Sequence, residues 1–267
     1  MSNVKTKFQK VNLTINSVKE TARIISFIRN TVKKAGFEKV VIGLSGGMDS
    51  SVSFSLSVKA LGVDNVIGVM MPYGDWQKES VEDVIKLAKI LDFPDKNLLN
   101  FNIKNFADNY LNINEDMDQV RKGNVMVRVR MIILYDLSKK FKALVIGTEN
   151  RTEKILGYFT RFGDEASDIE AILHLYKTQV RQLADYLKIP DKIIKKPPTA
   201  GLWRGQTDEG EFGFSYAEAD KILYLSIDKG LSQSEIIEEG YKSDIVNKVL
   251  TRVAENEFKH KLPYIIK

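Results

Sequence analysis

Residues 43–50 read GLSGGMDS and follow the apolar run 39–42. Adjacent glycines leave backbone N–H groups uncovered, and a helix starting just after them adds the positive end of its dipole, which suits a phosphate. The segment differs from a G-x-x-x-x-G-K-[ST] loop because Asp49 replaces the expected basic residue. An acid beside phosphates is explained if it binds Mg²⁺, whose usual ligands are carboxylates and substrate phosphates.

The alternative for this segment is a tight turn followed by a helix with a favourable acidic charge in its first turn. A Gly-Gly turn alone would favour that alternative. The complete S-G-G-x-D-S pattern between an apolar run and a helix favours the phosphate site.

Two further candidates come from the apolar run 143–148, which ends at Thr148 and is followed by Glu153. Because the carboxyl ends of parallel strands meet at one edge of a sheet, we expect Asp49 and Glu153 to lie together. That is the arrangement that two ligands of one Mg²⁺ require. The alternative for Glu153 is a solvated carboxylate between basic neighbours.

Strands alternating with helices must position these candidates. Short apolar runs predict strands at 39–44, 65–71, 97–103 and 143–148. Periodic segments predict helices at 15–34, 49–60, 79–91, 122–141, 176–188, 216–227, 231–238 and 241–258. This order predicts an α/β fold with a doubly wound, mainly parallel sheet flanked by helices. Without a linker or repeat, residues 1–267 are expected to form a single domain.

The stretch 196–214 breaks the alternation, with four glycines and two prolines in the run KPPTAGLWRGQTDEGEFGF. A loop of this length in a compact domain is usually a lid, a binding loop or a disordered segment. Trp203 and Phe212 would be unusual in a solvated linker. We therefore expect a lid that closes over bound ligand.

Composition excludes several kinds of chemistry. The sequence has no Cys and only two His, His174 and His260, so thiolate nucleophiles and Cys-rich or His-rich metal sites are excluded. A net charge of +5 is spread along the chain without a basic arm, so it fits nucleotides as well as RNA, and the expectation of nucleotide partners without nucleic acid rests on the resemblance given below. No apolar run approaches the ~18 residues of a membrane span, and the start of the sequence lacks a signal peptide. The expected location is the cytoplasm.

The segment 45–51 resembles the pyrophosphatase loop of the ATP pyrophosphatases, which release AMP and pyrophosphate. A second segment, 147–168, reads GTENRTEKILGYFTRFGDEASD and resembles the signature of the ammonia-dependent NAD synthetases. Further matches to that family lie at 176–179, 196–200 and 260–261. The resemblance therefore extends over nearly the whole chain and implies a fold of the Rossmann-like adenine nucleotide alpha hydrolase type.

Two departures from the family pattern are visible. Glu165-Ala166 replaces a frequent Gly-Gly, and Asn150-Arg151-Thr152 replaces a frequent His-Ala-Ala. Neither departure falls on a residue to which the resemblance assigns a role.

The resemblance assigns three groups of site residues. Asp49, Glu153 and Lys177 form the catalytic group, with Asp49 and Glu153 as Mg²⁺ ligands. The ATP-binding residues are Gly43, Leu44, Ser45, Gly46, Gly47, Met48, Asp49, Ser50, Thr148, Lys177 and Thr199. The residues for deamido-NAD, the nicotinic acid adenine dinucleotide, are Arg128, Arg161, Asp168, His260 and Lys261.

The implied reaction is amidation of deamido-NAD with ammonia through an acyl-adenylate, with ATP as co-substrate and Mg²⁺ as cofactor. Since the chain has no Cys for the usual glutamine hydrolysis, free ammonia is expected unless a separate glutaminase supplies it. The family further implies a homodimer. The alternatives are another ligase with the same loop, similar to GMP synthetase or a tRNA-modifying enzyme, and a module that binds ATP without turnover.

Overall fold

The computed structural model describes residues 11–114, 116–261 and 263–266. Residues 1–10, on which the expectation of no signal peptide partly rests, lie outside the described residues. A five-stranded sheet in the order β3-β2-β1-β4-β5 forms the centre. Its strands are β1 (Lys39–Gly43), β2 (Val66–Met70), β3 (Leu98–Asn100), β4 (Ala143–Gly147) and β5 (Ile169–Glu170).

All neighbouring strands pair in parallel, which confirms the predicted sheet. The strand order reverses between β1 and β4, where Ile42 is aligned with Ile146. Ligands of doubly wound sheets bind in the crevice beyond such a reversal. The loops that follow β1 and β4 carry the predicted motifs, so the motifs lie at the same edge of the sheet.

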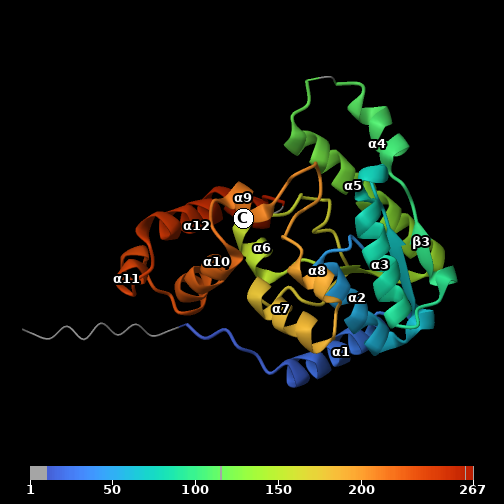
Figure 1. The fold of residues 1–267 in the computed structure, drawn as a ribbon, viewed down its shortest axis with the longest axis horizontal. Coiled ribbons are helices and arrows are strands. Elements are labelled where there is room, and N and C mark those ends of the chain that lie inside the picture. The colour runs from blue at the N-terminus through green and yellow to red at the C-terminus, as the bar shows by residue number, and fades with distance from the viewer. Residues whose placement is uncertain (1–10, 115, 262, 267) are drawn as a thin grey trace, which may run out of the picture.

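Helices cover both faces of the sheet (Figure 1). Val40 and Ile42 of β1 point into one core, and Val41 between them points into the other. The first core is built by α1 (Ser17–Lys34), α2 (Met48–Leu61), α3 (Lys78–Ile90), α7 (Lys177–Tyr186) and α8 (Asp191–Lys195). The second core is built by α4 (Lys104–Leu111) and α5 (Gln119–Phe141). Apolar side chains on both faces explain why these strands read as continuous apolar runs.

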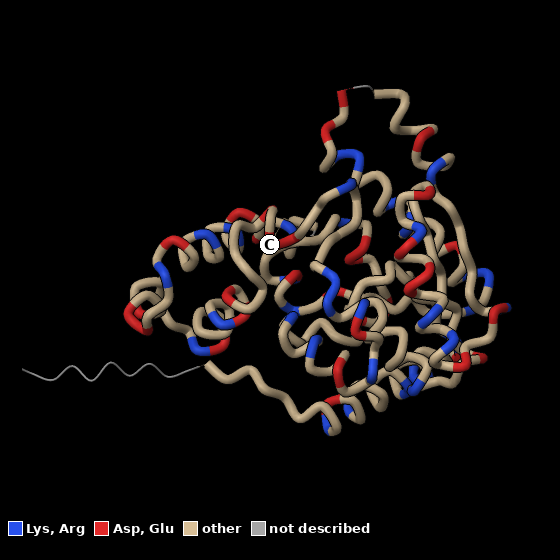
Figure 2. The backbone as a smooth tube through the Cα atoms, in the orientation of Figure 1, with Lys and Arg blue, Asp and Glu red and all other residues tan. Residues whose placement is uncertain are grey.

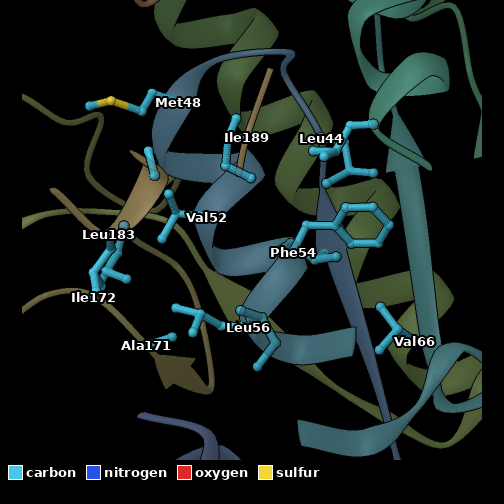
Figure 3. Close-up of a cluster of buried hydrophobic side chains, with 14 of the residues drawn as sticks. Leu44, Met48, Val52, Phe54, Leu56, Val66, Ala171, Ile172, Leu183 and Ile189 are labelled. Atoms are coloured by element: carbon cyan, nitrogen blue, oxygen red, sulfur yellow. The ribbon is translucent and has the colours of Figure 1, made fainter. Parts of the chain in front are cut away.

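Helix α2 follows the phosphate-loop candidate and places Val52, Phe54 and Leu56 in the larger core (Figure 3). The ring of Phe54 meets that of Phe93 edge-on, with ring centres 4.8 Å apart. The helix is buried nearly all round despite five serines. The hydroxyls of Ser55 and Ser57 donate to carbonyls one turn earlier, at 2.9 and 2.7 Å. Internal hydrogen bonds of this kind let a polar helix lie in an apolar core.

The C-terminal helices form a third cluster beside the sheet, at the left of Figure 1. They are α9 (Asp208–Phe212), α10 (Tyr216–Leu223), α11 (Gln233–Glu238) and α12 (Ser243–Asn256), packed against α6 (Arg151–Leu156). Positive and negative side chains are interspersed along the described chain (Figure 2). Within the described residues, no helix is both long and apolar enough to cross a membrane.

Several predicted boundaries were wrong. The strand predicted at 97–103 is only Leu98–Asn100, at the edge of the sheet. The helix predicted from 122 begins at Gln119, because the Asp118 carboxylate caps the Arg121 N–H. The helix predicted at 216–227 changes after Leu223 into a π-helix, Tyr224–Asp228. Short elements without a clear period were missed: β5, α4, α6, α8 and α9.

Candidate active site

The loop after β1 requires glycine at Gly46. Its φ is +73°, and a Cβ there would lie 2.5 Å from the Ser80 carbonyl oxygen. Ser45 Oγ accepts from the Gly47 N–H at 3.2 Å, and the Ser50 hydroxyl donates to the Gly47 carbonyl at 3.1 Å. The loop is therefore preshaped by its own side chains. Gly47 is the N-cap of α2 and lacks a side-chain cap, as expected for a helix end that receives an anion.

Asp49 and Glu153 meet at the ammonium group of Lys177. Lys177 Nζ lies 2.5 Å from Asp49 Oδ2 and 3.0 Å from Glu153 Oε1. The three residues come from the starts of α2, α6 and α7, which follow β1, β4 and β5 in the chain. Burial by itself would lower the Lys177 pKa, but the two carboxylates outweigh it and raise that pKa. Lys177 is therefore charged at neutral pH, although its side chain is only 9% exposed.

Glu153 has a second structural task at the start of α6. Asn150 and Glu153 form a capping box, in which Asn150 Oδ1 accepts from the Glu153 N–H at 3.0 Å. Burial raises the pKa of Glu153, and the Lys177 ammonium opposes that rise. The carboxylate therefore depends on nearby positive charge for its ionised form.

The family departure at Asn150-Arg151-Thr152 proves to contact the catalytic group. Asn150 Nδ2 donates to Asp49 Oδ1 at 3.0 Å. The Thr152 hydroxyl oxygen accepts from the Lys177 backbone N–H at 2.9 Å. The same hydroxyl donates to Asp220 Oδ1 at 2.6 Å. These two residues fix Asp49 and the start of α7. The sequence signal was present in the motif, but its spacing alone does not show which side chains touch.

The donor chemistry at this point fits a hard cation. Two carboxylates converge on a single ammonium group, which shows that the pair attracts positive charge. Mg²⁺ typically takes one or two protein carboxylates and completes its shell with phosphate oxygens and water. Among the described residues no group of three acidic or His side chains forms a self-sufficient metal site. Asp49 and Glu153 therefore suit an ion that arrives with a phosphate ligand.

A cavity of about 760 Å³ opens beside these residues. Its lining includes every residue predicted to bind ATP: Gly43, Leu44, Ser45, Gly46, Gly47, Met48, Asp49, Ser50, Thr148, Lys177 and Thr199. The loop 196–207 forms part of the wall, whereas residues 208–212 of the predicted lid form helix α9. A cavity of this size accommodates a nucleotide-sized ligand.

Some lining residues were missed by sequence reasoning, among them Arg130, Asp208 and Lys259. Arg130 Nε donates to the Met71 carbonyl at 3.0 Å, and burial lowers its pKa to about 10. Lys259 Nζ donates to the Gly157 carbonyl at 2.5 Å. Arg130 lies two residues after the predicted Arg128, and Lys259 directly precedes the predicted His260. The motifs therefore indicated segments of the chain that reach the cavity. Asp208 carried no signal beyond its place in the long loop.

The predicted deamido-NAD residues are placed differently. In the described part of the chain, none of the five belongs to the lining of this cavity. Arg128 Nε donates to the Arg161 carbonyl at 3.2 Å, and the Arg161 guanidinium lies 5.1 Å from the centre of the Phe258 ring. His260 lies beside Phe159, with ring centres 5.6 Å apart.

The remaining two residues have structural partners. Asp168 Oδ2 accepts from the Val145 N–H at 2.7 Å, where β4 meets β5. Lys261 is exposed and forms an ion pair with Glu257. Arg128, Arg161, His260 and Lys261 thus lie on the outside of the molecule, and the assignment of all five residues to deamido-NAD stays a prediction.

A parallel sheet with a glycine loop, carboxylates and a lysine at its switch point defines an α/β nucleotide-binding protein with phosphate chemistry. Residues 20–263 match the sequence model of the NAD synthase family. The chain belongs to the NAD synthase family.

Individual relatives agree with this assignment. The NH(3)-dependent NAD(+) synthetase of Chlorobaculum tepidum is 42% identical over 92% of this chain and 88% of its own length. Among solved structures, NMN synthetase from Francisella tularensis has a TM-score of 0.82 at 29% identity, covering 95% of this chain and 100% of that one. The NH3-dependent NAD synthetase from Campylobacter jejuni has a TM-score of 0.80 at 31% identity, with the same coverage.

Proposed function

We propose that this protein is an ammonia-dependent NAD synthetase, which amidates deamido-NAD with ATP and ammonia and releases AMP and pyrophosphate. The observation that carries the proposal is the contact of Lys177 with both Asp49 and Glu153 beside the glycine loop and the cavity. Family membership and the relatives named as NH(3)-dependent synthetases support the choice of substrates.

The first step activates a poor acyl donor. An oxygen of the nicotinate carboxylate attacks the α-phosphorus of ATP, which forms the acyl-adenylate as the bond to pyrophosphate breaks. The backbone N–H groups of the glycine loop and the positive end of α2 hold the departing pyrophosphate. Lys177 faces the same phosphates. Its positive charge is already in position, so it stabilises the developing negative charge without rearrangement of the site. When bound at Asp49 and Glu153, Mg²⁺ neutralises charge on phosphate oxygens.

In the second step ammonia attacks the carbonyl carbon of the adenylate, loses a proton and expels AMP. No covalent protein nucleophile is needed. A chain without Cys also lacks the nucleophile with which amidotransferase domains usually hydrolyse glutamine, so ammonia is the nitrogen donor in this proposal. The loop 196–207 acts as a lid that keeps water from the adenylate while ammonia enters.

The outer position of the dinucleotide residues supports a homodimer. Arg128 and Arg161 lie near exposed apolar side chains, with Ile132 50% exposed on α5 and Phe162 59% exposed. A second copy packed on this face would bury these groups and enclose the dinucleotide. A mass measurement in solution at micromolar concentration tests this part, and a monomer at that concentration contradicts it.

A substrate-omission assay tests the reaction itself. ATP, Mg²⁺, ammonium and deamido-NAD are mixed with the purified protein, and each component is left out in turn. One AMP and one pyrophosphate for each NAD, dependent on every component, is the expected result. AMP without NAD would retain the adenylating site but reject deamido-NAD as the substrate.

The second candidate function is amidation of nicotinic acid mononucleotide. The likeness to the NMN synthetase from Francisella tularensis, at a TM-score of 0.82, favours including it. Replacing deamido-NAD by the mononucleotide in the same assay separates the two. Faster turnover of the mononucleotide at equal subsaturating concentration would change the assigned substrate but leave the adenylation chemistry in place.

A further inference from the structure

We propose that Tyr216 and Asp208 are positioning residues that couple the occupancy of the phosphate site to closure of the loop 196–207. This inference rests on the proposed function, because it treats Glu153 and Lys177 as phosphate-site residues. Neither Tyr216 nor Asp208 needs to contact substrate for this role. They form a chain of hydrogen bonds between the catalytic group and the loop backbone.

The Tyr216 hydroxyl lies between two carboxylates. Its oxygen is 2.9 Å from Asp208 Oδ2 and 3.3 Å from Glu153 Oε1. A phenol has one proton to donate, so it cannot serve both carboxylates fully at once. Lys177 Nζ lies 4.9 Å from the centre of the same ring, so Tyr216 contacts both Glu153 and Lys177 of the catalytic group.

Asp208 connects this hydroxyl to the loop. Its Oδ1 accepts from the Ala200 N–H at 3.0 Å, and its own N–H donates to the Pro198 carbonyl at 3.0 Å. These two bonds lie on either side of Thr199, the loop residue predicted to bind ATP. Asp208 is 3% exposed, so breaking the bond from Ala200 takes one donor from a buried carboxylate, which is costly.

The Tyr158 hydroxyl completes the arrangement: its oxygen lies 2.9 Å from Asp208 Oδ1 and 3.2 Å from Glu211 Oε1, so the shorter contact is the one to Asp208. With the loop in this position, three donors therefore surround the Asp208 carboxylate: one backbone N–H and two phenols. If the loop opens, the Ala200 N–H is lost and the buried carboxylate is less well satisfied. Asp208 thus favours the closed position.

Occupancy of the phosphate site changes this balance through Glu153. When ATP and its cation engage Glu153, that carboxylate no longer needs the Tyr216 proton, which is then donated fully to Asp208. A stronger bond to Tyr216 fixes Asp208 and, through it, the loop segment around Thr199. Closure is thereby favoured only when the phosphates are in place, which limits the exposure of the adenylate to water.

Hydrogen exchange of the loop amides tests the coupling directly. The probe is ATP with Mg²⁺, without deamido-NAD, added to the wild-type protein and to Tyr216→Phe and Asp208→Asn. In the wild type, ATP should slow exchange at Ala200 and its neighbours in 196–207. In both variants this ATP-dependent protection should fall by about 3- to 10-fold, the effect of one lost hydrogen bond.

The second readout is the ratio of AMP to NAD in turnover. A loosely closed loop admits water to the adenylate, so both variants should release more than one AMP for each NAD, while the wild type stays near one. The loss should appear in kcat and in this ratio rather than in the KM for ammonium. A merely structural role would lower the stability of the variants without moving the ratio.

Tyr176→Phe is the matched control. Tyr176 is another buried tyrosine, and its hydroxyl donates to the Asp228 carboxylate at 2.8 Å, on a path that does not lead to the loop. This variant should retain the ATP-dependent protection of the loop and an AMP to NAD ratio near one. Equal losses in Tyr176→Phe and Tyr216→Phe would overturn the proposal, as would full protection in Tyr216→Phe.

The exchange experiment separates this inference from the proposed function. It needs only ATP binding, so it gives a result even if deamido-NAD is not the substrate. Absence of ATP-dependent protection in a wild type that makes NAD would reject the coupling alone. Should Asp208→Asn not fold, Tyr216→Phe still decides the question because it removes one oxygen and preserves the ring.

Discussion

The phosphate site and the outer face are built differently. The phosphate site, which comprises the glycine loop with Asp49, Glu153 and Lys177, lies at the ends of adjacent strands, and its charged groups pair with one another. The outer face, which comprises Arg128, Arg161, His260 and Lys261, lies on helix surfaces and turns. Its side chains meet rings or a carbonyl, and the ion pair between Lys261 and Glu257 is exposed.

The difference indicates how each region is made ready for its ligand. Side chains at the predicted phosphate site are held in place by the fold without a ligand, so we expect their removal to damage both the protein and the proposed reaction. Outer-face side chains are only loosely held and contribute little to folding. They are expected to act when the dinucleotide, and in our proposal a second copy, covers them.

Lys177→Met should have the largest effect. It leaves the Asp49 and Glu153 carboxylates buried without their shared cation, and breaking a buried charge pair costs about 3–5 kcal/mol. Loss of a preorganised charge at the phosphates should lower kcat by about 10²–10³-fold. Urea unfolding and the initial rate of NAD formation measure the two losses.

Lys195→Met is the control for this change. Lys195 Nζ lies 2.5 Å from Asp191 Oδ2, but the two side chains are 73% and 79% exposed. Since an ion pair in water contributes little to stability, this variant should lose little stability and little turnover. Similar losses in both variants would show that the phosphate site is no more preorganised than the surface.

Gly46→Ala should have the next largest effect. The added Cβ meets the Ser80 carbonyl oxygen at 2.5 Å and occupies a backbone conformation with φ +73°, so the loop must move. Gly36 also has a positive φ, +79°, but nothing lies within 4 Å of its Cβ position. Gly36→Ala therefore isolates the backbone strain of about 1–2 kcal/mol.

Isothermal titration with ATP and Mg²⁺ compares these two glycine variants. Gly46→Ala should weaken ATP binding by about 10-fold or more, the equivalent of one or two lost hydrogen bonds to a charged group. Gly36→Ala should bind ATP like the wild type while losing some stability. Unchanged binding by Gly46→Ala would mean that the loop does not hold phosphate.

The same difference between the two regions explains which contacts could be predicted from the sequence. Parallel strands force the ends of β1 and β4 together, so a motif after each strand is enough to predict that Asp49 and Glu153 meet. Neither Asp208 nor Tyr216 could be found in this way. Both act through side chains that converge from α9 and α10, and the packing of short helices depends on tertiary contacts rather than on a local period.

The sequence also could not show which side chains of the C-terminal segment face the cavity. His260 and Lys261 were predicted as the site residues, whereas Lys259 is the residue whose side chain reaches the cavity. Residues 257–260 form a 3-10 helix, in which side chains point in new directions at each step. The motif therefore indicated a segment that reaches the cavity, and the assignment of His260 and Lys261 to deamido-NAD stays a prediction.

Arg128→Ala tests the outer face. Since Arg128 is exposed and, within the described residues, donates to the Arg161 carbonyl, its loss should change stability by less than about 0.5 kcal/mol. The KM for deamido-NAD should rise by about 10-fold, the value of one hydrogen bond to an anion, while the KM for ATP stays the same. Arg121→Ala, on the same helix and 49% exposed, is the matched control. A parallel rise in both KM values would assign Arg128 to folding or to ATP.

Glu149→Gln should have the smallest effect on turnover. The pH dependence of its stability tests whether burial controls the charge of this carboxyl group, in contrast to the exposed groups of the outer face. Burial raises the pKa of Glu149 to about 9 from 4.5, against the opposing charge of Lys154. The folded state thus keeps a proton that the unfolded state releases, so stability is complete below pH 4.5 and falls as pH rises towards 9. The slope is at most about 1.4 kcal/mol per pH unit. Glutamine mimics the protonated acid, so Glu149→Gln should flatten the fall in urea stability between pH 6 and pH 9, whereas the exposed Glu238→Gln should not. An unchanged slope would show that Glu149 is ionised in the folded protein. Burial at the sheet edge would then control the charge of a carboxyl group less strongly than the contrast with the exposed outer face implies.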